Sequence, residues 1–140
     1  MISNVAFTVP GEPQGKGRAR IGKVGPHARM FTPAKTVAYE GLVALAAQRA
    51  MDGHQPFACA LAVQIDAWHP IPASWSKTRQ RDALLGALRP TTKPDIDNIA
   101  KAIADGGNGV AWADDKQIVS LTVQRFYGAA PRVDVRVATL

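Results

Sequence analysis

Alternation of apolar and polar residues predicts four strands in this chain. Residues 2–10 (ISNVAFTVP) alternate up to Pro10, and a second strand is predicted over residues 58–68. Residues 116–128 and 132–140 predict two closing strands joined by an Ala-Ala-Pro turn. A strand with one buried face places every second residue on that face. The predicted buried positions are Leu61, Val63, Ile65 and Ala67 in the second strand and Val133, Val135 and Val137 in the last.

Helical signals lie between these strands. Residues 32–51 begin with Thr32, a candidate N-cap, and Pro33, which suits the first helical position. A shorter helix is predicted over residues 75–88, and the segment KPDIDNIAKAI (residues 93–103) has the i, i+3, i+4, i+7 spacing of a helix that packs on a core. The predicted apolar faces are Val37, Leu42, Leu45 and Ala46 in the first helix and Ile96, Ile99, Ala100 and Ile103 in the last.

A basic stretch separates the first strand from the first helix. No acidic residue occurs between Pro13 and Tyr39, and glycines are interleaved there with lysines and arginines. This composition predicts a flexible loop rather than a packed element. The predicted order is therefore β-α-β-(α)-α-β-β. It describes a small single domain over residues 1–140, of the α/β (α+β) class, with a mixed sheet packed by helices.

Composition narrows the class of partner. The chain has 140 residues, is 46% hydrophobic and 20% charged, and carries a formal net charge of +6, which together indicate a globular protein with a polyanionic partner. Its single cysteine, Cys59, excludes an intramolecular disulfide framework and a cysteine-rich zinc site, and its apolar surroundings predict a buried thiol. No apolar run is long enough for a membrane span and no signal peptide is visible, so we expect a cytoplasmic protein.

Acidic residues gather in one part of this basic chain. Asp95 and Asp97 flank a helix start, and Asp114 and Asp115 precede a strand. The simplest interpretation is helix capping for the first pair and a polar turn for the second. The alternative is that both pairs converge on a cation, because clustered carboxylates repel one another without one. Oxygen ligands without cysteine or paired histidine favour Mg²⁺, with Mn²⁺ as a substitute, and such a metal suits phosphodiester hydrolysis.

Lys101 lies four residues after Asp97, on the same side of the predicted helix. A surface salt bridge with Asp97 is the favoured interpretation from spacing. Beside a metal site, the lysine would instead neutralise the scissile phosphate or assist proton transfer. Trp112 precedes the second acidic pair, and core packing is the expected role of its ring, with walling of the site as the alternative.

The segment KPDIDNIAKAIADGGNGVAWADDKQIV resembles the signature of the RusA family of Holliday-junction resolvases, crossover-junction endodeoxyribonucleases of bacteria and prophages. The resemblance is strongest over residues 93–121 and extends more loosely to GKGRAR, MFTPAKTVAYE and IPASWSKTRQ. It implies a RusA-like fold and a symmetric homodimer that cuts a four-way DNA junction in paired strands. It places the family's essential carboxylates on Asp95, Asp97 and Asp115, the neighbouring acid on Asp114 and the essential lysine on Lys101.

The resemblance has one departure, because many members read Asp-Ala-Leu-Asn-Gly where this chain has DGGNG at residues 105–109. Two glycines there remove a core side chain, weaken the helix end by roughly 1 kcal/mol each, and put the stiffness of the following turn in question. The expected contacts to DNA backbone phosphates are Lys16, Arg18, Arg20, Lys23, Arg29 and Lys93. The alternatives are a catalytically silent module that binds DNA junctions, and a metal nuclease that acts on other branched DNA.

Overall fold

The computed structural model describes residues 2–17, 20–24, 27–31 and 33–140, with the backbone alone for residues 20–24 and 27–31. The elements are β1 (Asn4–Pro10), β2 (Arg20–Val24), β3 (His27–Phe31), α1 (Ala34–Met51), β4 (Leu61–His69), α2 (Lys77–Leu84), α3 (Ile96–Gly107), the 3₁₀ turn η1 (Asp115–Gln117), β5 (Ile118–Tyr127) and β6 (Arg132–Thr139).

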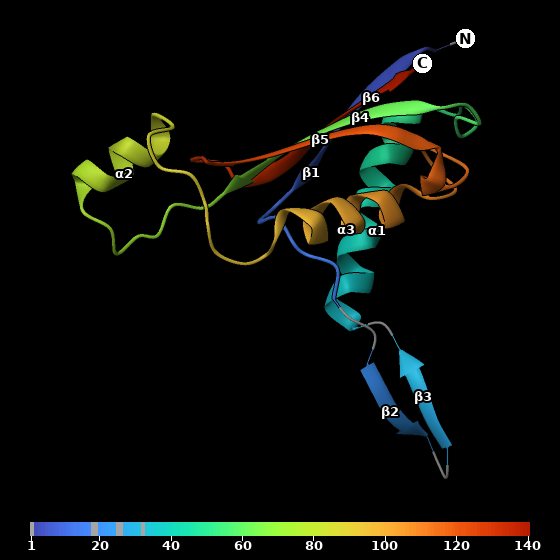
Figure 1. The fold of residues 1–140 in the computed structure, drawn as a ribbon, viewed down its shortest axis with the longest axis horizontal. Coiled ribbons are helices and arrows are strands. Elements are labelled where there is room, and N and C mark those ends of the chain that lie inside the picture. The colour runs from blue at the N-terminus through green and yellow to red at the C-terminus, as the bar shows by residue number, and fades with distance from the viewer. Residues whose placement is uncertain (1, 18–19, 25–26, 32) are drawn as a thin grey trace.

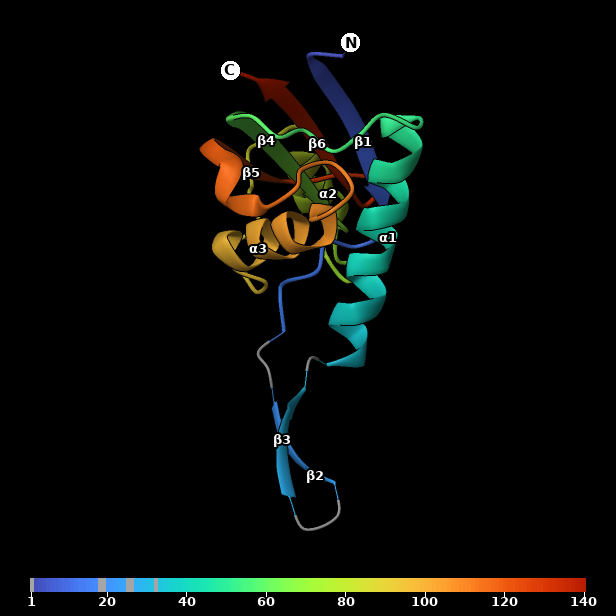
Figure 2. The same ribbon diagram turned by 90° about the vertical axis from the view of Figure 1, so that its right-hand side faces the viewer.

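The main sheet has four strands in the order β1-β6-β4-β5. β6 pairs antiparallel with both β1 and β4, and β4 pairs parallel with β5. Helices α1 and α3 lie side by side on one face of this sheet, and α2 stands apart at one end (Figures 1 and 2). The predicted class is confirmed: this is a small α+β domain built on a mixed sheet.

The core lies between the sheet and the two helices. The strand prediction is confirmed, because the alternate residues named for the second and last strands are all buried. On the helix side, the core receives Tyr39, Val43, Ala47 and Met51 from α1 and Ile99 and Ile103 from α3. Burial of each large apolar side chain stabilises the fold by roughly 1.5–3 kcal/mol. The N-terminal half of α3 is thereby fixed beside the sheet.

The predicted apolar face of the first helix is wrong for three of its four residues, while Ala46 is partly buried against the core. Val37, Leu42 and Leu45 are 58%, 44% and 43% exposed. The buried residues of α1 are Thr36, Tyr39, Val43, Ala47 and Met51, which repeat every three to four residues. Ile96 of α3 is also 44% exposed, so its predicted place in the core is wrong. Both helices contain apolar residues on more than one side, and contact between α1 and α3 selects which side is buried.

The predicted basic loop contains an antiparallel hairpin. β2 and β3 pair with Arg20 opposite Phe31 and Val24 opposite His27, so the prediction of a stretch without regular structure is wrong for these residues. Figures 1 and 2 both show the hairpin extending from the body beyond the start of α1. The predicted N-cap Thr32 lies outside the described residues. α1 starts at Ala34, and Pro33, expected at the first helical position, is its N-cap and makes no side-chain capping hydrogen bond.

Gly106 and Gly107 of the DGGNG segment belong to α3 and not to the turn after it, and the expected weakening of the helix end stays a prediction. Gly106 and Gly107 form the last turn of α3 and are buried. A Cβ on Gly106 would lie 2.6 Å from Cβ of Val43, and one on Gly107 would overlap the ring of Trp112. The N–H of Gly109 donates to the carbonyl of Trp112 at 2.7 Å, and the indole Nε1 donates to the carbonyl of Ala104 at 3.0 Å. The glycines therefore allow close packing that holds the turn.

Two further features differ from, or add to, the sequence predictions. Cys59 is exposed, so the predicted buried thiol is wrong. The second helix is shorter than predicted and is capped by Ser76, whose hydroxyl accepts from the N–H of Arg79. No helix among the described residues has the length and apolar character needed to cross a membrane.

Candidate active site

Asp95 and Asp97 lie at the N-terminus of α3. Asp95 is the N-cap, and its carbonyl accepts the N–H of Ile99 at 3.0 Å, but its side chain makes no capping hydrogen bond. Both acids are exposed. Within the described part of the chain, neither carboxylate takes part in a hydrogen bond or an ion pair. Their oxygens are therefore available to an external ligand, in a position where the helix dipole favours negative charge.

Lys101 belongs to α3, and its side chain extends toward η1. Its Nζ is 3.1 Å from Asp105 and 3.6 Å from Asp115, while its side chain is 54% exposed. The predicted salt bridge with Asp97 is absent from the ion pairs of the described residues, because the lysine turns toward the C-terminal half of its helix. The structure thus brings Lys101 beside Asp115, as a shared site requires, and leaves its ammonium group partly open to solvent.

Lys16 extends this ion-pair network toward the N-terminal segment. Its Nζ contacts Oδ2 of Asp105 at 3.0 Å and also pairs with Glu40 of α1. Lys16 and Asp105 are only 25% and 17% exposed at their side chains. The resulting chain of contacts, which we call the charge network, comprises Glu40, Lys16, Asp105, Lys101 and Asp115.

The pKa values follow from these contacts. The hydrogen bond to Glu40 raises the pKa of Lys16, and Asp105 adds to that increase against partial burial. Burial alone would raise the pKa of Asp105, but the two lysines outweigh it and hold the pKa below its ordinary value. Asp105 is also the main cause of the raised pKa of Lys101. All three groups are therefore charged at neutral pH, and Lys101 holds its proton more strongly than a free lysine does.

Asp114 caps η1. Its Oδ1 accepts the N–H of Lys116 at 2.9 Å, and its own N–H donates to Oε1 of Gln117 at 2.8 Å. The hydrogen bond from the backbone N–H of Lys116 lowers the pKa of the Asp114 carboxyl. Gln117 in turn donates to the carbonyls of Phe57 and Cys59. The turn interpretation of this acidic pair thus describes the backbone correctly, and the turn is anchored to the segment that precedes β4.

The donor set fits a hard divalent cation in chemistry, since Asp95, Asp97, Asp114 and Asp115 offer only carboxylate oxygens. Asp95 and Asp97 carry no partner within the described residues that a cation would have to displace. Among the described residues, however, no three His, Cys, Asp or Glu side chains form a group that could hold a metal ion. The convergence of three or four carboxylates expected from the sequence is therefore not seen in this arrangement.

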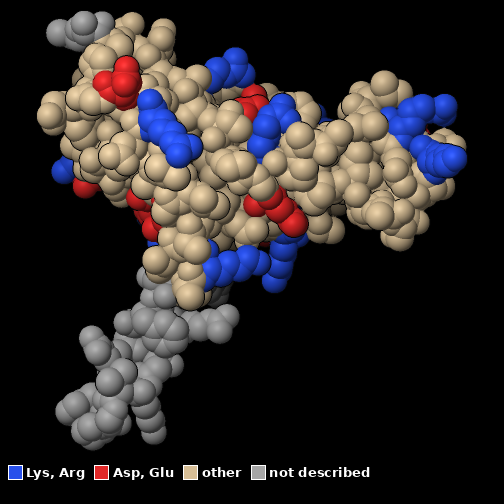
Figure 3. Space-filling model, turned by 180° about the vertical axis from the view of Figure 1, so that it is seen from behind, with Lys and Arg blue, Asp and Glu red and all other residues tan. Residues whose placement is uncertain are grey.

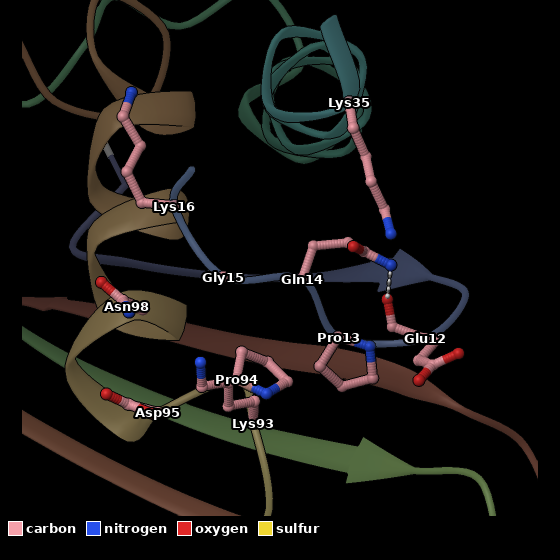
Figure 4. A pocket seen from close by; sticks show the side chains of 10 residues that line it. All are labelled: Glu12, Pro13, Gln14, Gly15, Lys16, Lys35, Lys93, Pro94, Asp95 and Asn98. Atoms are coloured by element: carbon pink, nitrogen blue, oxygen red, sulfur yellow. Dashed lines mark hydrogen bonds between the residues drawn. The ribbon is translucent and has the colours of Figure 1, made fainter. Parts of the chain in front are cut away.

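A cleft of about 610 Å³ adjoins Asp95 (Figure 4). It is bounded by the segment after β1, the start of α1 and the loop before α3. Three lysines from these three segments line it, namely Lys16, Lys35 and Lys93. The side chain of Asn98, one turn into α3, also faces the cleft. Positive charge beside an exposed carboxylate suits an anionic chain that passes over the start of α3.

The remaining predicted DNA contacts fall in or near the hairpin. Arg18 lies outside the described residues, and the side chains of Arg20, Lys23 and Arg29 are likewise not described, although their backbones belong to β2 and β3. Figure 3 shows acidic and basic side chains next to each other on the body, and further basic ones on the projecting part that carries α2. α2 itself contains Lys77, Arg79 and Arg81, which were not among the contacts predicted from the sequence.

Two acids of the charge network, Glu40 and Asp105, were not among the site residues predicted from the sequence. The spacing of Lys101 and Asp105 at i and i+4 was a usable signal, since residues four apart share a helix side. Glu40 gave no such signal because its partner, Lys16, is 24 residues away along the chain.

Fold and site together describe a small nuclease-like domain with exposed carboxylates at the start of α3 and, on the same helix, a lysine beside Asp115. Residues 10–138 match the family described as Endodeoxyribonuclease RusA. A protein of Bacillus subtilis (strain 168) named "Uncharacterized protein YqaN" is 37% identical over 138 residues, which cover 95% of this chain and 94% of that protein. The chain belongs to the RusA family. Membership implies an endonuclease of the Holliday-junction-resolvase class, acting on branched DNA.

Proposed function

We propose that this chain is a Mg²⁺-dependent endodeoxyribonuclease that resolves four-way DNA junctions as a homodimer, in DNA recombination and repair in the cytoplasm. Residues 1–140 would act as one nuclease domain. The observation that carries the proposal is the position of Lys101, beside Asp115 and on the helix that starts with Asp95 and Asp97, in a chain of the RusA family.

Asp95, Asp97 and Asp115 would hold the metal, with Asp114 in support, and Mn²⁺ would substitute for Mg²⁺. The bound cation supplies an activated water and a positive charge for the phosphate oxygens. Lys101 contributes the second positive charge, because its ammonium group is partly exposed and its raised pKa keeps it protonated. From this position it would neutralise a non-bridging phosphate oxygen or donate a proton to the leaving oxygen.

DNA would approach over the start of α3. Lys93 lines the cleft beside Asp95, and we propose it as a phosphate contact together with Arg18, Arg20, Lys23 and Arg29 of the hairpin region. Such contacts fix the position of the duplex arms without reading sequence. A homodimer is proposed because a four-way junction needs paired cuts and each chain offers one set of acids.

The test is cleavage of a synthetic four-way junction by the purified protein with Mg²⁺, Mn²⁺ or EDTA, beside a flap and a nicked duplex of the same sequence. We expect paired, symmetric nicks in the junction with either metal and none in EDTA. Cleavage of the flap or nicked duplex in preference to the junction would contradict the proposed substrate. Salt-sensitive junction binding without any cleavage would instead indicate a catalytically silent binding module.

A further inference from the structure

The charge network connects the segment that leads into the hairpin with the proposed catalytic lysine. Gly15, Lys16 and Gly17 run between the N-terminal halves of α1 and α3, and we call these three residues the clamp segment. The N–H of Lys16 donates to the carbonyl of Asn98 at 3.0 Å, and the N–H of Gly17 donates to Oγ1 of Thr36 at 2.9 Å. The clamp segment is therefore hydrogen-bonded to both helices.

Close packing at the two glycines shows how tightly the segment fits. A Cβ on Gly15 would lie 2.8 Å from Cβ of Pro94 and 3.2 Å from Cβ of Asn98. A Cβ on Gly17 would overlap the hydroxyl of Thr36 and lie 3.1 Å from Cγ of Pro33. Only residues without a side chain fit on either side of Lys16, so the backbone fixes where the lysine side chain starts.

Lys16 uses its side chain inside the protein. Its ammonium group lies between Glu40 and Asp105, and its side chain is three-quarters buried. A contact to a DNA phosphate needs an ammonium group that reaches solvent, and this one is already paired with two carboxylates. Asp105 is shared in turn, with Oδ2 toward Lys16 and Oδ1 toward Lys101. Asp105 thus fixes the position of Lys101, the proposed catalytic lysine, through one oxygen. Lys16 fixes the position of Asp105 through its other oxygen.

We propose that Lys16 and Asp105 are positioning residues that hold Lys101 beside Asp115, and that Lys16 is not a phosphate contact. This inference rests on the proposed nuclease function for the role of Lys101. Without Asp105, the ammonium group of Lys101 keeps only its longer contact to Asp115 and samples more orientations. Without Lys16, Asp105 loses the ion pair that fixes its second oxygen, and Lys101 loses its orientation indirectly.

The functional test separates positioning from phosphate binding. Lys16→Met, Lys16→Arg, Asp105→Asn and Lys23→Met are compared for single-turnover junction cleavage at saturating protein, and for junction affinity against salt concentration in Ca²⁺. We expect Lys16→Met and Asp105→Asn to cleave about 10-fold or more slowly with affinity and salt slope unchanged, and Lys16→Arg to recover most of the rate. Lys23→Met, the matched control, should reduce the salt slope by about 0.9, as loss of one phosphate contact does.

A second measurement does not depend on cleavage. Lysine ammonium groups held in ion pairs give observable ¹H–¹⁵N correlations, so the wild-type protein should show signals for Lys16 and Lys101. Asp105→Asn should remove the Lys101 signal. The control Asp52→Asn makes the same change at the far end of α1, about 18 Å along the helix from Glu40, and should retain it.

The outcomes are distinct. If Lys16→Met lowers the salt slope by about 0.9 and cleaves at the wild-type rate when saturating, Lys16 is a phosphate contact and the inference is wrong. Retention of the Lys101 signal in Asp105→Asn, or slower cleavage that Lys16→Arg does not recover, would also overturn it. Absence of cleavage by the wild-type protein contradicts the proposed function alone, and the ammonium signals then still decide whether Asp105 holds Lys101.

Discussion

The two halves of α3 differ in what surrounds their charged side chains. In the N-terminal half, Asp95 and Asp97 are exposed and have no side-chain partner among the described residues. From the middle of the helix to its end, Lys101 and Asp105 belong to the charge network, and Gly106 packs against α1. One helix thus presents acids that are free to take a ligand and a lysine that is already held in place.

This difference indicates two separate roles along α3, namely ligand binding at its start and positioning of Lys101 further along. Free carboxylates at a helix start are stabilised by the dipole without being neutralised, so they retain their affinity for a cation. A lysine held by carboxylates on both sides stays protonated and oriented before substrate arrives, and orientation in advance is a major source of catalytic rate. Changes to Asp95 and Asp97 should therefore affect cleavage with little effect on folding, and changes to the buried glycines Gly106 and Gly107 should affect folding.

The largest effect is expected from Asp97→Asn. It removes one proposed metal ligand, and we expect junction cleavage to fall by at least about 10²-fold, because losing even an outer-shell partner costs 10–100-fold. The free energy of unfolding, measured in urea, should stay within about 0.5 kcal/mol of wild type, since the carboxylate has no partner to lose among the described residues. Symmetric nicking at the wild-type rate would remove Asp97 from the site.

Gly107→Ala, at the C-terminal end of α3, should destabilise the protein. The new Cβ would overlap the Trp112 ring, and overpacking of this kind costs typically about 1–3 kcal/mol. Urea denaturation measures the change. Gly41→Ala is the matched control, because Gly41 lies within α1 and a Cβ added there would meet no atom within 4 Å, so alanine should stabilise the protein by about 0.4–1 kcal/mol. Equal effects of the two substitutions would contradict close packing at Gly107.

The sheet was predictable from sequence because its inner face is buried along β4 and β6, which forces period-two alternation. The start of α3 was predictable as well, since Asp95 marks it. The buried side of α1 was not, because alanines and leucines occur around most of that helix and its partner sets the orientation. Gly106 and Gly107 looked like a weak helix end because sequence does not show what packs against them. Likewise, Lys16 looked like one more basic loop residue until Glu40 and Asp105 were placed beside it.

A pH-sensitive hydrogen bond between His69 and Arg125 lies next to the loop that leads into α3. Nε2 of His69 accepts from Nε of Arg125 at 3.2 Å, and Arg125 also donates to the carbonyl of Thr92, in the loop before α3. Burial, followed by repulsion from Arg125, lowers the pKa of His69 to about 4. Because the unfolded histidine titrates near 6.5, it binds more protons than the folded one between about pH 6.5 and pH 4. Stability contributed by neutral His69 is therefore lost as pH falls through that window.

We expect the free energy of unfolding to lose on the order of 2 kcal/mol through protonation of His69. Comparison with His69→Asn isolates this contribution, because asparagine does not titrate. The measurement is the free energy of unfolding in urea at several pH values between about 7 and 4. The wild-type curve should fall more steeply than that of the variant below about pH 6.5. Parallel curves would show that His69 is protonated equally in both states.

The smallest expected effect is stabilisation by Mg²⁺ itself, and it tests whether the free acids form a site. A ligand that binds only the folded protein adds about 1.4 kcal/mol at ten times its dissociation constant. The urea midpoint of the wild-type protein should therefore rise with Mg²⁺, and that of Asp97→Asn should not, since the variant lacks a ligand. Asp105→Asn should retain the response, because Asp105 is bound to two lysines and is not among the proposed ligands. If Asp105→Asn lost the response and Asp97→Asn kept it, the metal would bind at the charge network. Metal binding would then belong to Asp105 and not to the acids at the start of α3.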